Sequence, residues 1–377
     1  MTQKPRRAVL VLDGDSPNAL NVARALGLTR AWRVHVLRPG AAWRARIDWS
    51  RHVASHRIAR SGVATPGYIE EVVRAAERVG AEVIFPLSEG TALRCLEARE
   101  RIEPVARLVP LAAPDRFRCA IDKGSFSEFL SARGLPQPRT VVHRSGAALP
   151  PIPPDFAFPA IVKPARGEYG RGITKAETRA ELDRALRGLG SEAGFVVQEF
   201  VEGTDFDCSI LARDGRLLAW TMQEETMPDG RAFAPAAAIR FLEEGPTLAM
   251  IERLVAALEW SGLAHIDMRR SRRTGEVLVL EVNARPWGSI LGSVEAGVNF
   301  PDLACRAALG LALPEVRRRA VDFDKHGWRL QGMRAWMRRT AGDGPPRASQ
   351  FAYCLRDPVP EVLTWFFDRL RGKRRPA

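Results

Sequence analysis

Two carboxylates in residues 263–289 are spaced to meet across a predicted hairpin. We expect strands over 264–269 and 277–284, joined by a polar turn centred near Thr274. Asp267 and Glu281 are each seven residues from Thr274, so a chain that folds back there places them opposite each other. This pairing predicts that both carboxylates lie on one face of the sheet.

Two further polar residues follow Glu281 with the period of a strand. Asn283 and Arg285 come two and four residues later, so they share its face. Carboxylate and amide oxygens are ligands that Mg²⁺ accepts, and an arginine fork suits a phosphoryl or carboxylate group. The alternative is a sheet edge with solvated charges, but Glu281 lies in an apolar run where an unpaired carboxylate is costly. The pattern favours a magnesium site formed by Asp267, Glu281 and Asn283.

A glycine-rich loop follows the predicted strand 160–164. Lys163 is near the end of this strand, and Gly167, Gly170 and Gly172 follow it. Glycines let a backbone approach phosphate oxygens closely, and a lysine adds a point charge beside them. An ordinary turn is the alternative, so this loop alone is weak support for a phosphate site.

A third segment, residues 196–203, could bind a nucleoside. An extended edge around Gln198, Glu199 and Val201 could read a base through its backbone, and a nearby acid, Asp205 or Asp207, could accept ribose hydroxyls. Taken singly, these acids are also what an ordinary surface carries.

The N-terminal part predicts an open parallel sheet. Apolar strands at 8–12, 33–37 and 82–87 alternate with helices at about 18–26 and 67–80. Right-handed crossovers would place these strands in one sheet. The three-glycine pattern of a dinucleotide site is missing around Gly14, which argues against a nicotinamide cofactor there.

Later segments carry equally local signals. We expect a helix at 125–133, an exposed proline-rich connector at 147–159, a helix capped by Thr178, a hairpin turn at Asp214-Gly215 and a helix at 248–260. The tail after Leu313 is arginine-rich and has few obvious strands.

Composition limits the class of protein. With 46% hydrophobic and 27% charged residues, the 377-residue chain is of ordinary globular type, and no apolar run is long enough to cross a bilayer. Its five cysteines lack the spacing of a zinc or redox site, which favours buried free thiols. We therefore expect a soluble, cytoplasmic protein.

The net charge of +13 is concentrated near the end of the chain. Residues 315–377 hold 15 Lys and Arg against 7 Asp and Glu, and no nucleic-acid motif accompanies them, so nucleic-acid binding is not expected. Val362, Trp365, Phe366 and Leu370 with the basic run 369–375 could form a membrane-surface helix. A terminal helix that docks its aromatic residues on the body is the favoured alternative.

These elements, in this order, resemble the ATP-grasp superfamily over about residues 118–310. Within it, the segment Asn283-Ala284-Arg285-Pro286-Trp287-Gly288-Ser289 resembles a motif of the predicted carboxylate–amine ligase, or carboligase-like, subgroup. The resemblance implies nucleotide contacts at the following positions: Lys123, Lys163, the loop with Gly167, Gly170 and Gly172, the hinge with Gln198, Glu199 and Val201, and the ribose carboxylate Asp205. The family often has Glu in place of Gln198, and Asp207 is close enough to leave the ribose assignment open.

The resemblance also implies a fold and a reaction. The fold class is α/β, with an α+β catalytic part. Domains are expected at 1–115 (N-terminal), 116–312 (ATP-grasp, with a lid at about 116–198 and a metal-binding part at about 199–312) and 313–377 (basic extension).

The implied enzyme uses ATP and Mg²⁺, with Mn²⁺ as a possible substitute, to activate a substrate carboxylate as an acyl phosphate for attack by an amine. Asp267, Glu281 and Asn283 would hold the metal, and Arg285 and Lys163 would be catalytic. Small-molecule substrates and a possible homodimer are the expected partners. His265 is a candidate general base, although a structural role is favoured. The alternative is an ATP-binding regulatory protein without ligase chemistry.

Overall fold

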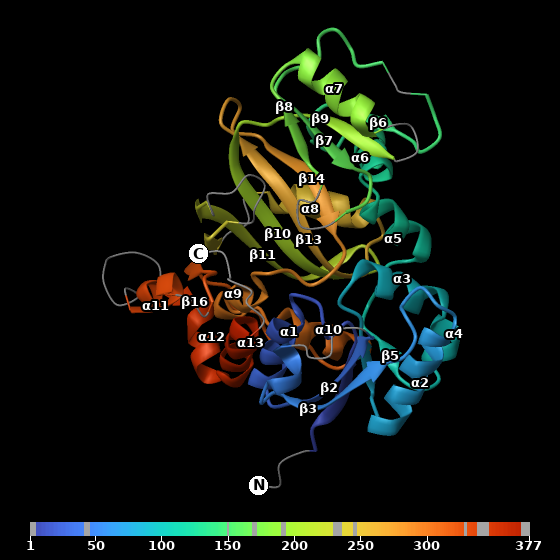
Figure 1. Ribbon diagram of the computed structural model, residues 1–377, viewed down its shortest axis with the longest axis vertical. Helices are drawn as coiled ribbons and strands as arrows, with labels where there is room; N and C mark the ends of the chain where they lie inside the picture. Colours follow the sequence, from blue (N-terminus) through green and yellow to red (C-terminus); the bar gives the residue numbers. More distant parts are fainter. Residues whose placement is uncertain are drawn as a thin grey trace.

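The computed structural model describes residues 5–40, 46–148, 151–167, 172–189, 194–228, 236–243, 247–327, 330–337 and 347–370. Three sheets organise these residues: a parallel sheet at one end, a large mixed sheet in the middle and a small antiparallel sheet at the other end (Figure 1). Within the described residues, every helix is too short or too polar to cross a membrane.

The N-terminal sheet has five parallel strands in the order β3-β2-β1-β4-β5. This confirms the expected open parallel sheet. The periodic pattern predicted β1, β2, β4, α1 and α2 but missed the partly exposed strand β3 and the short helices that follow β4. The bounds are β1 Arg7–Val11, α1 Ala19–Leu28, β2 Trp32–Pro39, η1 Arg46–Trp49, β3 Val53–Ala59, α2 Gly67–Val79, β4 Val83–Phe85, α3 Glu89–Glu97, α4 Arg99–Ile102 and β5 Arg107–Leu108.

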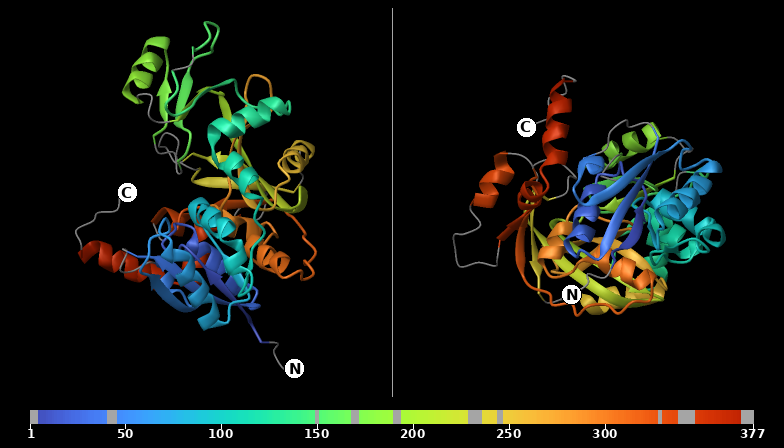
Figure 2. Two further views of the ribbon diagram at one scale, coloured as in Figure 1. Left: turned by 90° about the vertical axis from the view of Figure 1, so that its right-hand side faces the viewer. Right: turned by 90° about the horizontal axis from the view of Figure 1, so that it is seen from below.

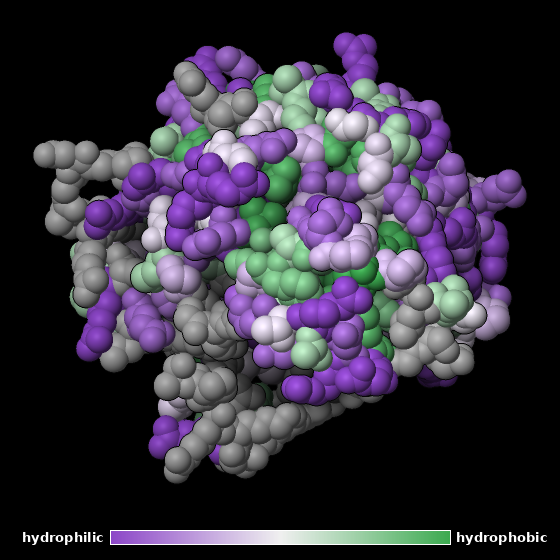
Figure 3. Space-filling view, turned by 90° about the horizontal axis from the view of Figure 1, so that it is seen from above, coloured by the Kyte–Doolittle hydropathy of each residue, from purple (hydrophilic) through white to green (hydrophobic). Residues whose placement is uncertain are grey.

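A four-stranded antiparallel sheet in the order β6-β9-β7-β8, with α7 on one face, contains most of the segment expected to form the lid and is called the lid sheet here (Figure 1). Its apolar core includes Val162, Leu182, Phe195 and Val197. Seen from the lid end, the molecular surface is largely hydrophilic with smaller hydrophobic areas (Figure 3). The bounds here are α5 Pro114–Ile121, α6 Lys123–Ala132, β6 Thr140–His143, β7 Ala160–Pro164, β8 Thr174–Ala176, α7 Arg179–Leu189 and β9 Phe195–Glu199.

The central sheet has seven strands in the order β14-β13-β10-β11-β12-β15-β16. Its long β10–β11 hairpin turns at Asp214 and Gly215, whose φ angles are 51° and 74°, so the predicted turn is confirmed. The bounds are β10 Gly203–Arg213, β11 Arg216–Met227, β12 Ala238–Leu242, α8 Leu248–Ala257, β13 Gly262–Ser271, β14 Val277–Asn283, α9 Ile290–Glu295 and α10 Phe300–Ala308.

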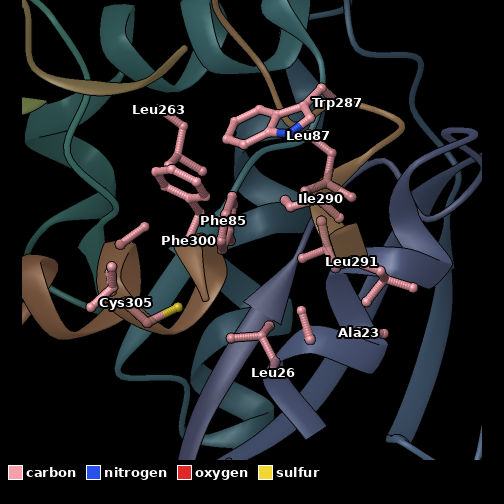
Figure 4. Close-up of a cluster of buried hydrophobic side chains, with 14 of the residues drawn as sticks. Ala23, Leu26, Phe85, Leu87, Leu263, Trp287, Ile290, Leu291, Phe300 and Cys305 are labelled. Carbon is pink, nitrogen blue, oxygen red and sulfur yellow. The ribbon is translucent and has the colours of Figure 1, made fainter. Parts of the chain in front are cut away.

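Helices cover one face of this sheet, and the N-terminal part packs against the other. α5, α6 and α8 contribute Phe117, Phe126 and Leu254 to a core that also contains Ile266 of β13. On the opposite side, Trp287 and Phe300 meet Phe85 and Leu87 of the N-terminal part in a second core (Figure 4). This second core fixes the N-terminal sheet against the segment that carries Arg285.

The C-terminal tail is built into the body. Its described residues contain two short strands, β15, which pairs with β12, and β16, which pairs with β15, in keeping with the expectation of few strands. Helices α12 and α13 lie beside α1 and α9, and α11 packs against α12 (Figures 1 and 2). The buried carboxylate of Asp357 accepts a hydrogen bond from the Arg24 Nε at 3.1 Å. The bounds are β15 Val321–Asp324, α11 Leu330–Met337, β16 Arg347–Ser349, α12 Gln350–Arg356 and α13 Val359–Leu370.

Candidate functional site

A β-bulge in β14 sets the register of the predicted metal site. Next to the turn, Arg270 pairs with Val277, and this register alone would place Asp267 opposite Leu280. The ladder instead shifts between Asp267 and Met268, so Asp267 lies opposite Glu281 and His265 opposite Asn283. The extra residue turns the Glu281 side chain away from the core face that Val277 and Val279 occupy.

The three predicted metal ligands lie side by side on the cleft face. The Asn283 Nδ2 donates to the Asp267 Oδ2 at 3.0 Å, and the Glu281 Oε2 lies 3.0 Å from the Lys123 Nζ. Lys123 begins α6, where the Asp122 carboxylate caps the helix by accepting from the Ser125 N–H. The helix cap therefore fixes the lysine that contacts the hairpin.

The pKa values of Asp267 and Glu281 are shifted in opposite directions. Burial raises the pKa of Asp267 well above its usual range, and the negative charges of Glu281 and Asp207 raise it further. For Glu281, burial opposes ionisation, but Lys123 and Lys163 outweigh that effect and lower its pKa. A cation bound between these carboxylates would relieve their mutual repulsion.

His265 and Asp207 join this group. The alternation of side chains along the strand predicted that His265 shares the face of Asp267 and lies opposite Asn283, which the ladder confirms, whereas Asp207 was not predicted there. Asp207 lies opposite Asp267 in the β10–β13 ladder, and the His265 Nε2 is 3.4 Å from Asp267 and 3.8 Å from Asp207. One ligand atom from each of the three residues lies within 4.8 Å of the others, a second arrangement that could hold a metal. Asp207 accepts a hydrogen bond from the Gln223 Nε2 at 3.1 Å. The two-residue spacing of Asp205 and Asp207 on one strand was the signal available in the sequence.

The pKa values of Asp207 and His265 are both shifted. Burial, followed by the charge of Asp205, raises the pKa of Asp207 to about 7. Burial, with Lys325 and Arg285 nearby, lowers the pKa of His265 to about 3. His265 stacks on Trp287 with ring centroids 5.4 Å apart, and its Nδ1 lies 2.9 Å from the Ser209 Oγ. The imidazole is therefore a neutral, firmly held group.

Arg285 lies just beyond β14 and is held from two sides. Its Nη2 donates to the Asn283 Oδ1 at 3.1 Å, and its Nη1 donates to the Pro286 carbonyl at 3.3 Å. Asn18, at the N-terminus of α1, donates to the same carbonyl at 2.8 Å. The N-terminal part thus helps to position the arginine.

Lys163 and Gln198 form a buried pair under the lid. The Lys163 Nζ donates to the Gln198 Oε1 at 3.0 Å, and the Gln198 Nε2 donates to the Thr140 Oγ1 at 3.0 Å. Burial lowers the pKa of Lys163, while Glu281 partly offsets this effect. The two residues lie on neighbouring strands, because β7 and β9 are paired.

The glycine-rich loop returns close to the strand that precedes it. A Cβ on Gly172, whose φ is 74°, would meet the Pro164 ring at 2.9 Å, so glycine is required there. The Lys123 Nζ donates to the Gly167 carbonyl at 3.2 Å. Gly170, the other predicted phosphate contact, lies outside the described residues.

Arg269 organises the segment predicted to bind the nucleoside, and the sequence argument did not single it out. Its guanidinium donates to the carbonyls of Val201 and Gly203, at 2.6 and 2.9 Å, and pairs with Asp205. Glu199 accepts from the Ala157 N–H at 2.9 Å. Both Asp205 and Glu199 are therefore engaged within the protein while still lining the cleft.

One cleft of about 1110 Å³ connects these groups. Nine of the predicted site residues line it: Lys163, Gln198, Glu199, Val201, Asp205, Asp267, Glu281, Asn283 and Arg285. Its far wall was not predicted: Asn18, Asn21 and Arg46 come from the N-terminal part, and Lys325, His326, Gln350, Cys354 and Glu361 come from the C-terminal tail. Trp287, Gly288 and Ser289 are among the described residues that line the cleft, whereas residues 88–90 are not. Glu89 accepts from the Ala284 N–H and so supports the strand exit.

Comparison with known proteins identifies relatives. The family model described as "ATP-grasp in the biosynthetic pathway with Ter operon" matches residues 191–329. A D-alanine–D-alanine ligase from Polaromonas sp. is 27% identical over 217 residues, which cover 52% of this chain and 64% of that protein. The chain spans about half to two thirds of the length of the first curated relatives it matches.

Solved structures share the fold. The biotin carboxylase domain of 2-oxoglutarate carboxylase from Hydrogenobacter thermophilus, in a complex with MgADP, has a TM-score of 0.64 at 16% identity, covering 84% of this chain and 73% of that one. An L-amino acid ligase from Bacillus licheniformis has a TM-score of 0.60 at 18% identity, covering 81% and 75%. These structures confirm the α/β fold class. The expected resemblance to the ATP-grasp superfamily is confirmed by the family model over residues 191–329 and by the related ligases.

Proposed function

We propose that this protein is an ATP- and Mg²⁺-dependent ligase of the carboxylate–amine type, which activates a small-molecule carboxylate as an acyl phosphate for attack by an amine. The register of β13 and β14 carries the proposal, because it brings Asp267, Glu281 and Asn283 together with Arg285 along one cleft. Lys123 of α6 contacts this group through Glu281, at 3.0 Å. The names of the related ligases support the type of reaction.

The side chains fit a hard divalent cation. Asp267, Glu281 and Asn283 offer oxygen atoms from one face of the hairpin. Burial, and after it the negative charges of Glu281 and Asp207, raise the pKa of Asp267, and a bound cation would offset both effects. When bound, Mg²⁺ would neutralise charge on the transferred phosphoryl group. The neighbouring imidazole of His265 adds a nitrogen donor, which is consistent with Mn²⁺ as a substitute.

The chain's own cations would complete the charge balance. Lys123 contacts both the Glu281 carboxylate and the Gly167 carbonyl, so it links the β13–β14 hairpin to the glycine-rich loop. Arg285, fixed by Asn283 and the Pro286 carbonyl, would stabilise charge that develops on the acyl phosphate. Lys163 would contact phosphate oxygens from the lid side, and the backbone at Gly167 and Gly172 would approach the phosphates closely.

The nucleoside would occupy the end of the cleft between the lid and β13. Ile161, Ile173, Met268 and Leu280 give this end apolar walls, and Gln198, Glu199 and Val201 form its edge. Asp205 would accept the ribose hydroxyls, because Arg269 ties it to the hinge, whereas Asp207 lies with the metal ligands. The geometry thus favours Asp205 in the choice that the sequence left open.

The acyl phosphate itself gives the most direct test. Purified protein with ATP, Mg²⁺ and hydroxylamine is screened over amino acids and hydroxy acids, and hydroxamate is measured, because hydroxylamine traps acyl phosphates. Glu281→Ala should lower hydroxamate formation by at least about a hundredfold. Glu276→Ala, an exposed acid on the same hairpin, is the matched control and should retain activity.

Two results would reject parts of this proposal. A folded Glu281→Ala protein with normal turnover would reject the metal assignment. ATP binding without hydroxamate for any carboxylate in the panel would favour the alternative, a nucleotide-binding regulatory protein.

A further inference from the structure

The last described helix, α13, turns an apolar face to solvent. Val359, Val362 and Phe366 are spaced by three and four residues, and Trp365 lies beside them; each is 45–49% exposed. A helix on a globular protein normally buries such a stripe. Here the buried side of the helix instead holds Glu361, which pairs with Arg24 and Arg46.

The orientation of α13 is fixed by contacts with the body. Phe367 stacks on Trp49 with ring centroids 5.8 Å apart. The adjoining Asp357 accepts from the Ser50 Oγ at 2.7 Å and from the Arg51 N–H at 3.1 Å. The stripe of Val359, Val362, Trp365 and Phe366, hereafter the α13 stripe, is thus held outward by buried polar bonds. The expectation that this helix docks its aromatic residues on the body holds for Phe367 alone, because Trp365 and Phe366 remain exposed.

Positive charge adjoins the α13 stripe. Arg369 lies one turn beyond Phe366, with its guanidinium 5.4 Å from the Trp365 ring centre. In the sequence, residues 369–377 contain four arginines, one lysine and no acid. A tryptophan, a phenylalanine and arginines in this order are typical of helices that lie in the interface of an anionic membrane.

We propose that the α13 stripe is a docking surface for an anionic lipid bilayer, which the protein binds peripherally. Trp365, Phe366 and the two valines enter the headgroup boundary, while Arg369 contacts lipid phosphates. Self-association through this stripe is disfavoured, because it would bring the basic segments of two copies together on a chain with a net charge of +13. The inner face of α13 lines the cleft through Glu361, so the bound protein would keep its cleft beside the docking helix.

Co-sedimentation of the full chain with vesicles tests this surface. We expect binding to vesicles of equal parts phosphatidylcholine and phosphatidylglycerol, weakening with salt, and at least about tenfold weaker binding to pure phosphatidylcholine. Trp365→Ser with Phe366→Ser should weaken binding at least about tenfold, and so should Arg369→Glu with Arg371→Glu. Ile58→Ser with Leu189→Ser, two similarly exposed apolar residues elsewhere, is the matched control and should bind as the original protein does.

Equal thermal unfolding of all variants would show that they are folded. Unchanged vesicle binding in the Trp365/Phe366 variant would overturn the proposal, as would equal binding to both kinds of vesicle. Sedimentation equilibrium without lipid supplies a further check: a dimer that the Trp365/Phe366 variant converts to a monomer would assign the stripe to a second copy of the chain and overturn the lipid proposal.

Discussion

Asp267 lies directly opposite Glu281 in the β13–β14 ladder, because Leu280 is left unpaired as the extra residue of a β-bulge in β14. The bulge lets Leu280 and Glu281, neighbours in sequence, both face the cleft. It therefore joins an apolar wall to a carboxylate at the boundary between the proposed nucleoside and metal ends. Both features arise from a single local irregularity.

Deletion of Leu280 should leave the metal end intact. Without the extra residue, a regular ladder still pairs Met268 with Val279 and Asp267 with Glu281. We expect the deletion variant to retain Mg²⁺-dependent turnover, with KM for ATP raised about tenfold by loss of the apolar wall. Steady-state kinetics would measure this, and Leu280→Ala should resemble the deletion. Complete loss of turnover in the folded deletion variant would contradict the assignment.

The two acids at the metal end should differ in importance. Asp267→Asn replaces a charged proposed ligand by a neutral amide, which binds Mg²⁺ more weakly, and should lower kcat at least about a hundredfold. Asp207→Asn keeps the contact with Gln223 and should lower it by less than about tenfold. Titration of turnover with Mg²⁺ and Mn²⁺ separates the two variants, and chelation of the metal should stop turnover in the original protein. Equal losses in both variants would mean that Asp207 is itself an essential ligand.

Arg269 should act on nucleotide affinity and not on the chemical step. Replacement by alanine removes the donors to Val201, Gly203 and Asp205, so the segment predicted to bind the nucleoside is no longer held in place. We expect KM for ATP to rise about tenfold or more, with kcat reduced by less than about threefold. Arg272→Ala provides a control, since Arg272 forms an exposed ion pair on the next turn. A main effect on kcat would show that Arg269 contributes to phosphoryl transfer.

The sequence predicted those strands and turns whose residues carry the signal within a few positions of one another. Buried strands β1, β4 and β7 have continuous apolar runs, and the Asp214-Gly215 turn requires positive φ angles that its residues tolerate. The pairing of Asp267 with Glu281 was predicted by counting outward from Thr274, although the ladder reaches it through a bulge. A parity argument could have found this bulge, because Glu281 has the same parity as the buried Val277 and Val279.

Long-range contacts were not predictable in this way. The far wall of the cleft includes Gln350 and Glu361, which reach it because Arg24 and Asp357, 333 residues apart, bond in the core. Nothing in the local spacing of the tail encodes a partner on α1. The role of Arg269 was not predictable either, because it depends on the Val201 and Gly203 carbonyls, which lie more than 60 positions earlier in the chain.

Arg24 should be a main source of stability for the tail. Its side chain is fully buried and donates to the Asp357 carboxylate and carbonyl and to the Glu361 carboxylate, at 3.0–3.3 Å. Arg24→Leu leaves both acids in the core without this cation, which should lower the free energy of unfolding by about 3–5 kcal/mol. Arg94→Leu, which breaks an exposed pair with Glu97, should cost less than about 1 kcal/mol. Urea unfolding monitored by tryptophan fluorescence compares the two. Similar losses of unfolding free energy in both variants would contradict a structural role for the buried network. The double variant Arg24→Leu with Asp357→Leu should lose less unfolding free energy than the sum of the two single variants, because the Arg24 and Asp357 side chains interact directly.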